Sequence, residues 1–126
     1  MAKDEKADWL AREKYLSLES YKRTGEGVRT PLWFATGDGV IYVYSLANAG
    51  KVKRIRNNPR VKIAPCTIRG QVTGQWIEAE AQIVSGDQDK LGHELLTKKY
   101  GWQKRLGDFF SGLRKRERVV IAIRIN

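Results

Sequence analysis

The stretch most suited to chemistry runs from Ser45 to Arg60 and places small residues directly before a basic segment, SLANAGKVKRIRNNPR. This pattern predicts that a strand ends near Ser45 and that a helix follows over Asn48–Asn58. Asn48 has the side chain of an N-cap, and Pro59 would stop the helix. The first turn of a helix carries unpaired N–H groups and the positive end of the dipole, so it can bind an anion.

Gly50 and Lys51 fit an anion site in that first turn. Glycine lets a ligand approach the backbone closely. A cation such as Lys51 opposes the helix dipole there, at a cost of up to about 1 kcal/mol, unless it meets an anion. The same residues would also suit a solvated basic helix with an ordinary Asn cap. A second segment, around Arg29 and Pro31, favours binding of an anion. The Arg29 guanidinium can donate two parallel hydrogen bonds to a phosphate. Pro31 has no N–H group, so it cannot donate a hydrogen bond to a neighbouring strand.

Alternating apolar residues and turn signals predict six strands, and the early ones are joined as hairpins by Lys22–Gly27 and Asp38-Gly39. Their expected bounds are Tyr15–Tyr21, Val28–Thr36, Val40–Ser45, Arg60–Cys66, Gln75–Ser85 and Val119–Ile125. The last strand is almost continuously apolar, which indicates burial on both faces. The sequence therefore predicts a mainly β chain whose antiparallel strands close into a small barrel.

The accessory helices are expected on both sides of these strands. Lys3–Lys14 reads as a short surface helix, and Asp87 is expected to cap a helix that runs to about Tyr100 with an apolar stripe. Trp102–Leu113 would be a further helical turn or a packed loop. We therefore divide the chain into a helical segment, residues 1–14, and one barrel domain, residues 15–126.

Composition narrows the classes of function. The 126 residues carry 24 Lys and Arg against 14 Asp and Glu, a net charge of +10, which would attract a polyanion or a phosphorylated ligand or serve only solubility. No apolar run approaches the length of a membrane span, and the charged N-terminus lacks the apolar stretch of a signal peptide. A lone Cys66 excludes an intrachain disulfide, so we expect a reducing, cytoplasmic location.

The other residues that could form a metal site or a catalytic site show no pattern that favours either. A single His93 and a single Cys66 make a zinc site unexpected, so no metal ligand is assigned. No motif supports a Ser-His-Asp triad. Glu78 and Glu80 share one strand face, and as exposed polar positions they need no acid–base role. His93 is expected to lie on the surface or to be partly packed, and no catalytic residue is identified.

Three motifs, in order along the chain, resemble the pyridoxamine 5'-phosphate oxidase-like split-barrel superfamily. They are KRTGEGVRTPLWF, AGKVKRIRNNPRV and APC, and the resemblance covers about Tyr15 to Ser85. Within that superfamily the chain is similar to the deazaflavin (coenzyme F420)-dependent oxidoreductases. The resemblance implies a six-stranded antiparallel split β-barrel of the FMN-binding type, with FMN or F420 as the cofactor. The C-terminal extension of the vitamin-forming oxidases is missing, so pyridoxamine oxidation is not expected.

The resemblance also implies a cofactor site. The second strand would line the ring and ribityl chain, the third strand would follow, and the helix start would hold the phosphate with Lys51 as its main partner. A further residue, Gln75 on the fifth strand, would come from the second subunit of a homodimer with its sites at the interface. The implied residues are Arg29, Thr30, Pro31, Leu32, Tyr44, Ser45, Ala49, Gly50, Lys51 and Gln75. The basic tract Arg114–Arg118 would be a solvated loop or would bind an acidic tail of the cofactor.

Three hypotheses for function follow. The first is an oxidoreductase that transfers hydride between a bound flavin or deazaflavin and a small organic substrate. The second is a non-catalytic protein of the same fold that carries a flavin or haem. The third is a nucleic-acid-binding barrel, since basic residues are interleaved with Trp and Tyr; it ranks last because the aromatic residues sit at alternating, core-type positions.

Overall fold

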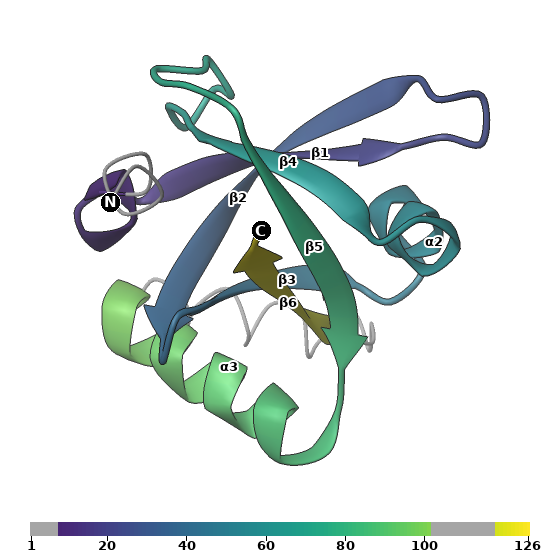
Figure 1. The fold of residues 1–126 in the computed structure, drawn as a ribbon. Coiled ribbons are helices and arrows are strands. Elements are labelled where there is room, and N and C mark those ends of the chain that lie inside the picture. Colours follow the sequence, from purple (N-terminus) through teal and green to yellow (C-terminus); the bar gives the residue numbers. More distant parts are fainter. Residues whose placement is uncertain (1–7, 102–117) are drawn as a thin grey trace.

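Six antiparallel strands close into a barrel in the order β1-β2-β3-β6-β5-β4 (Figure 1). The computed structural model describes residues 8–101 and 118–126. The strands are β1 (Tyr15–Tyr21), β2 (Gly27–Gly37), β3 (Val40–Leu46), β4 (Arg60–Pro65), β5 (Ile77–Val84) and β6 (Arg118–Ile125). The predicted six-stranded antiparallel barrel is therefore confirmed.

Strand burial follows the sequence pattern. In β5 the apolar residues Ile77, Ala79 and Ala81 are buried, and the polar residues between them are exposed. In β6 the run from Val120 to Ile123 is buried throughout. One face of β6 points into the barrel core, and the other packs under the helix α3 (Gly86–Tyr100). Burial on both faces, expected from the apolar run, is confirmed.

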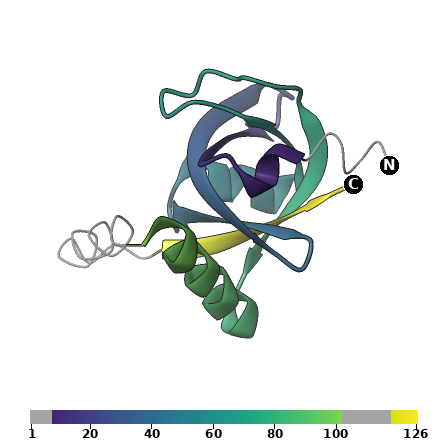
Figure 2. The ribbon, with the colours of Figure 1, turned by 90° about the vertical axis from the view of Figure 1, so that its left-hand side faces the viewer.

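The two open ends of the barrel are closed by short helices, as the view along the barrel shows (Figure 2). A 3-10 helix, η1 (Asp8–Ala11), lies across one end, and α2 (Gly50–Asn57) lies at the other. Trp9 of η1 is only 7% exposed and meets Phe34 edge-on at 5.7 Å. From α2, Val52 and Ile55 enter the same core cluster.

Three expectations about helices were wrong in part. The expected surface helix Lys3–Lys14 ends at Ala11 in its described part and buries Trp9, because an indole this large is more stable in the core than in water; residues 3–7 lie outside the described residues. The helix α2 begins at Gly50 with Ala49 as its N-cap, because the Ala49 N–H bonds to the Leu46 carbonyl and keeps the preceding residues in a turn. Asn48 is therefore no cap.

The third correction concerns α3. Its N-cap is Ser85, so Asp87 lies inside the first turn, where its charge favours the positive end of the dipole without capping it. The helix packs outside the barrel against β2, β3 and β6 (Figure 1). Gly92 permits this close approach, because a Cβ there would lie 2.6 Å from Val120 Cγ1.

The strands β2 and β3 pair over a short hairpin only and then separate. Asp38 and Gly39 have φ of 52° and 78°, as a type I′ turn requires. From this turn, β2 pairs with β3 only as far back as Phe34, whereas Gly27–Trp33 pair with β1. Among the described strands, none lies against the other edge of β2 at Pro31, as the expected edge position requires. The barrel is split along this line.

Some predictions fall outside this description. Trp102–Leu113 and the first four residues of the basic tract, 114–117, lie outside the described residues; Arg118 begins β6. The division of the chain after residue 14 stays a prediction. Within the described residues, no helix is both long and apolar enough to cross a membrane.

Candidate functional site

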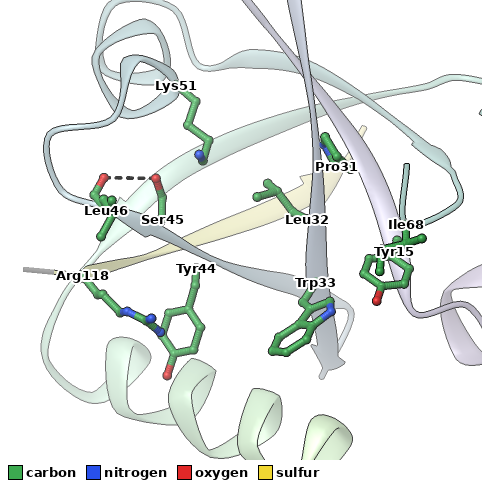
Figure 3. Close-up of a pocket in the computed structure, with 10 residues that line it drawn as sticks. All are labelled: Tyr15, Pro31, Leu32, Trp33, Tyr44, Ser45, Leu46, Lys51, Ile68 and Arg118. Atoms are coloured by element: carbon green, nitrogen blue, oxygen red, sulfur yellow. Dashed lines mark hydrogen bonds between the residues drawn. The ribbon is translucent and has the colours of Figure 1, made fainter. Parts of the chain in front are cut away.

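A cavity of about 410 Å³ lies where β2 and β3 diverge (Figure 3). Its wall draws on β1, β2, β3, β6, the start of α2 and the loop between β4 and β5. The lining residues are Tyr15, Pro31, Leu32, Trp33, Tyr44, Ser45, Leu46, Lys51, Ile68 and Arg118. The surface is mainly apolar and aromatic, with Lys51 and Arg118 as its cations. Such a surface suits a planar ligand that also carries an anionic group.

Lys51 points from α2 into this cavity (Figure 3). Burial lowers the pKa of its ammonium below the ordinary 10.5, and the nearby Arg54 lowers it further. In the part of the chain that the structure describes, no carboxylate forms an ion pair with Lys51. The cation is therefore partly desolvated and has no counter-charge among the described residues, and an anionic ligand would supply one.

The start of α2 adds further groups for an anion. Gly50 and Lys51 are its first residues, so their N–H groups have no partner within the helix. Arg54 folds back over this turn: a Cβ on Gly50 would lie only 2.8 Å from Arg54 Nη1. Arg54 Nε donates to Ser20 Oγ at 2.7 Å, which holds the guanidinium in place. Two cations thus lie beside one helix start.

The opposite end of the cavity is aromatic. The Trp33 ring stacks on Tyr100 at 4.7 Å with an angle of 10°. The Tyr44 hydroxyl contacts His93 Nδ1, and the two rings meet edge-on at 4.6 Å. Arg118 lies over the Tyr44 ring at 5.5 Å. Figure 3 shows Trp33 and Tyr44 on the side of the cavity nearest α3, away from Lys51.

Five of the ten residues implied by the resemblance line this cavity: Pro31, Leu32, Tyr44, Ser45 and Lys51. Two more, Ala49 and Gly50, form the start of α2 beside it. Ser45 is buried and its hydroxyl donates to the Leu46 carbonyl at 3.1 Å. The structure thus gathers residues from β2, β3 and α2 that are up to 20 positions apart in the sequence. Their role in binding stays a prediction.

The other three residues lie elsewhere. Arg29 pairs with Glu19 at 3.1 Å and lies over the Trp76 ring at 4.7 Å, so its guanidinium is engaged outside the cavity lining. Thr30 sits opposite Leu18 in the β1–β2 ladder. Gln75 is exposed in the loop before β5, which begins at Ile77. Its expected place on the fifth strand was wrong, because regular pairing with β4 starts only at Ile77.

Sequence reasoning missed half of the lining. Trp33 is one of the aromatic residues expected at core-type positions, but it lines the cavity, because β2 separates from β3 at this point. Arg54 could have been found from its spacing, since residues i and i+4 lie on one helix face and place it over Gly50. Ile68, which is 69% exposed at the rim, carries no sequence signal for a site.

His93 also has a more definite place than expected. It is a partly exposed residue of α3 that touches Tyr44 through Nδ1, and its Nε2 lies 3.7 Å from Asp89 Oδ2. No cluster of three or more His, Cys, Asp or Glu side chains suited to a metal ion occurs in residues 8–101 and 118–126. His93 therefore lies behind the cavity wall, in contact with Tyr44.

No family model matches the chain, and no curated protein matches it. Solved structures do share its fold. A Listeria innocua protein provisionally described as a pyridoxamine 5'-phosphate oxidase superposes with a TM-score of 0.68 at 16% identity, over 100% of this chain and 94% of its own. A FAD-binding protein from Mesorhizobium loti gives 0.64 at 21% identity, over 97% and 86%.

A third structure, the haem storage protein HutZ from Vibrio cholerae, gives a TM-score of 0.67 at 17% identity, over 97% of this chain and 88% of its own. At these identities the likeness shows the fold alone. The chain therefore has the split-barrel fold of pyridoxamine 5'-phosphate oxidase-like proteins, in agreement with the resemblance. A FAD-binding protein and a haem storage protein both have this fold, so the fold does not identify a ligand for this chain.

Proposed function

We propose that the chain is an oxidoreductase that binds FMN or coenzyme F420, with the phosphate at Lys51 and the ring at the aromatic end of the cavity. The observation that carries this proposal is Lys51 itself. Its ammonium points into an apolar cavity, its pKa is lowered by burial, and no described carboxylate pairs with it. An anion bound there would restore the stability of the charged form.

The residues present fit such a cofactor. A cavity of about 410 Å³ is of the size that holds drug-sized ligands, of roughly 300–1,000 Å³. One end offers Lys51 and the first N–H groups of α2, a set suited to phosphate. The other end offers the faces of Trp33 and Tyr44, against which a flat ring can stack. The net charge of +10 favours an anionic ligand as well.

When bound, the flavin or deazaflavin supplies hydride transfer to or from a small organic substrate. The chain's own part is to bind, orient and exclude water. Lys51 and α2 fix the phosphate, and Leu32 and Pro31 present apolar surface along the ribityl chain. No described side chain is assigned as nucleophile or general acid, so the substrate would be held mainly by the cofactor and the aromatic wall.

We extend the proposal to a homodimer in the cytoplasm that completes the cavity between its subunits. Ile68 supports this, since a large apolar side chain at the cavity rim is 69% exposed and would be covered by a second copy. Gln75 is exposed and available to such a neighbour. Light scattering on the purified protein tests the dimer: Ile68→Asp should shift it toward monomer, and Lys22→Asp on the distant β1–β2 turn should not.

The function is tested by fluorescence titration of the purified protein with FMN and with F420. We expect binding, and we expect Lys51→Met to weaken it at least tenfold. Lys53→Met is the matched control, because Lys53 lies on the same helix and is exposed to solvent. Equal affinities for the Lys51 variant and the wild type would overturn the phosphate assignment.

The same titration separates the alternatives. Tighter binding of F420 favours a deazaflavin reductase, and tighter binding of FMN favours a flavin oxidoreductase. Binding of haem with no affinity for either flavin would identify a haem carrier. Steeply salt-dependent binding of a random oligonucleotide, again without flavin binding, would identify a nucleic-acid-binding barrel.

A further inference from the structure

The helix α3 places two of its residues directly behind the two aromatic rings of the cavity wall. Tyr100 stacks on Trp33 at 4.7 Å, and His93 contacts Tyr44 through its Nδ1. His93 and Tyr100 are seven positions apart, or two helical turns, so they share one face of α3. One rigid element therefore supports both rings.

The support behind each ring is specific. The Tyr100 and Trp33 planes are 10° from parallel, so Tyr100 limits the tilt of Trp33. On the other side, His93 contacts the Tyr44 hydroxyl through Nδ1, and its Nε2 lies 3.7 Å from Asp89 Oδ2. In the tautomer that carries its proton on Nε2, the Nδ1 atom accepts from that hydroxyl. Arg118, over the Tyr44 ring, lies on a different strand.

The helix is itself fixed in position between these two residues. Leu96 is fully buried against Ala35 and Tyr100, and Gly92 packs so closely that a Cβ would meet both Val120 and Tyr42. A helix held this tightly cannot shift without disturbing the sheet. The distance between Trp33 and Tyr44 is thus set by α3, together with the backbones of β2 and β3.

We propose that His93 and Tyr100 are positioning residues that make the aromatic end of the cavity selective for a planar heterocyclic ring. They touch no ligand themselves and act by holding Tyr44 and Trp33. This inference rests on the proposed function, because it concerns the ring end of the same cavity. It separates two parts of recognition: Lys51 and α2 bind the phosphate, and α3 determines which rings fit.

Riboflavin and FMN test this division, because they share a ring and differ by the phosphate. We expect His93→Leu to weaken riboflavin binding about fivefold, the effect of losing roughly one neutral hydrogen bond. The ratio of FMN to riboflavin affinity should stay at its wild-type value. His93→Gln, which keeps an acceptor for the Tyr44 hydroxyl, should recover most of the affinity, and Glu94→Ala on the exposed face of α3 should change nothing.

A double-mutant cycle gives the sharper result. If His93 acts through Tyr44, then His93→Leu should cost little more once Tyr44→Phe has removed the hydroxyl. Additive losses would overturn the inference, and so would an unchanged riboflavin affinity in His93→Leu. Tyr100→Leu removes the ring behind Trp33 and should weaken riboflavin binding more than Tyr100→Phe, which keeps the stack. A wild-type chain that binds neither a flavin nor F420 overturns both proposals, whereas flavin binding that does not depend on His93 overturns only this one.

Discussion

The Tyr100 hydroxyl bonds to both backbone groups of Phe34: it accepts from the N–H at 2.8 Å and donates to the carbonyl at 2.6 Å. Its proton is shared with the Lys14 carbonyl, also at 2.6 Å. Phe34 is the residue at which β2 leaves β1 and begins to pair with β3. Tyr100 of α3 thus bonds to the backbone of β2 at the point where the barrel splits. The same hydroxyl also connects Lys14, just before β1, to this point.

Tyr100→Phe should therefore lower the free energy of unfolding by about 1–3 kcal/mol, because it leaves a buried N–H and a buried carbonyl without this partner. Denaturant titration measures the loss. Tyr15→Phe is the control, since no side-chain hydrogen bond of Tyr15 is present among the described residues. A Tyr100→Phe variant as stable as the wild type would show that water or another group satisfies Phe34.

Gly92→Ala should also destabilise the fold. The added methyl would lie 2.6 Å from Val120 Cγ1 and 3.1 Å from Tyr42 Cδ1, so α3 would have to move off the sheet. Overpacking of this kind costs about 1–3 kcal/mol, more than the gain in helix propensity from replacing glycine. Thermal unfolding of Gly92→Ala beside Glu94→Ala, an exposed site on the same helix, tests this. A rise in Tm for Gly92→Ala would contradict the packing.

Stability should depend on Glu19 in acid. Burial alone would raise its pKa, but the hydrogen bonds from Tyr21 and Arg29 outweigh burial and hold the pKa below the ordinary 4.5. A lowered carboxyl pKa stabilises the fold fully above pH 4.5, and this contribution is lost as the pH falls through the folded-state value. Glu19→Gln should thus be less stable than the wild type at pH 6, and the gap should close toward pH 3. Glu94→Gln, the control, should have the same stability as the wild type at every pH from 6 to 3.

Binding of a phosphorylated flavin should weaken in base. Because burial lowers the pKa of Lys51, its ammonium deprotonates below pH 10.5, and the anion then loses its counter-charge. The FMN affinity should fall as the pH rises toward 10.5. Lys51→Arg keeps its charge over that range and should show a flatter profile. Parallel profiles for the two proteins would mean that another group causes the change.

The fold could be predicted well because its signals are local. Alternation set the strands, and Asp38-Gly39 specified a hairpin whose positive φ angles suit these residues. Helix starts were less predictable: Asn48 looked like an N-cap, but the turn closed by Ala49 and Leu46 placed the start two residues later. The geometry of the connection after β3, and not the capping propensity of Asn48, therefore determines where this helix begins.

The site could be predicted only in part, since a cavity depends on contacts between distant segments. Lys51 stood out because its charge opposes the helix dipole. Arg29 looked equally suited to phosphate, yet Glu19 lies opposite it on β1 and forms an ion pair with its guanidinium. Nothing near Trp33 in the sequence shows that Tyr100, 67 positions later, stacks behind it. Such pairings arise only when α3 docks on the sheet.

The closed ends of the barrel have a consequence for how this protein can change. The helices η1 and α2 lie at opposite ends of the barrel, and Trp9 and Ile55 from them belong to the same core cluster, so the described barrel interior belongs to the folding core. The cavity lies at the split in the barrel, where β2 separates from β3 and pairs along only one edge. Substitutions that change which molecules the cavity accepts can therefore accumulate at this split while the interior stays constant. One scaffold could in this way diverge into binders of quite different molecules.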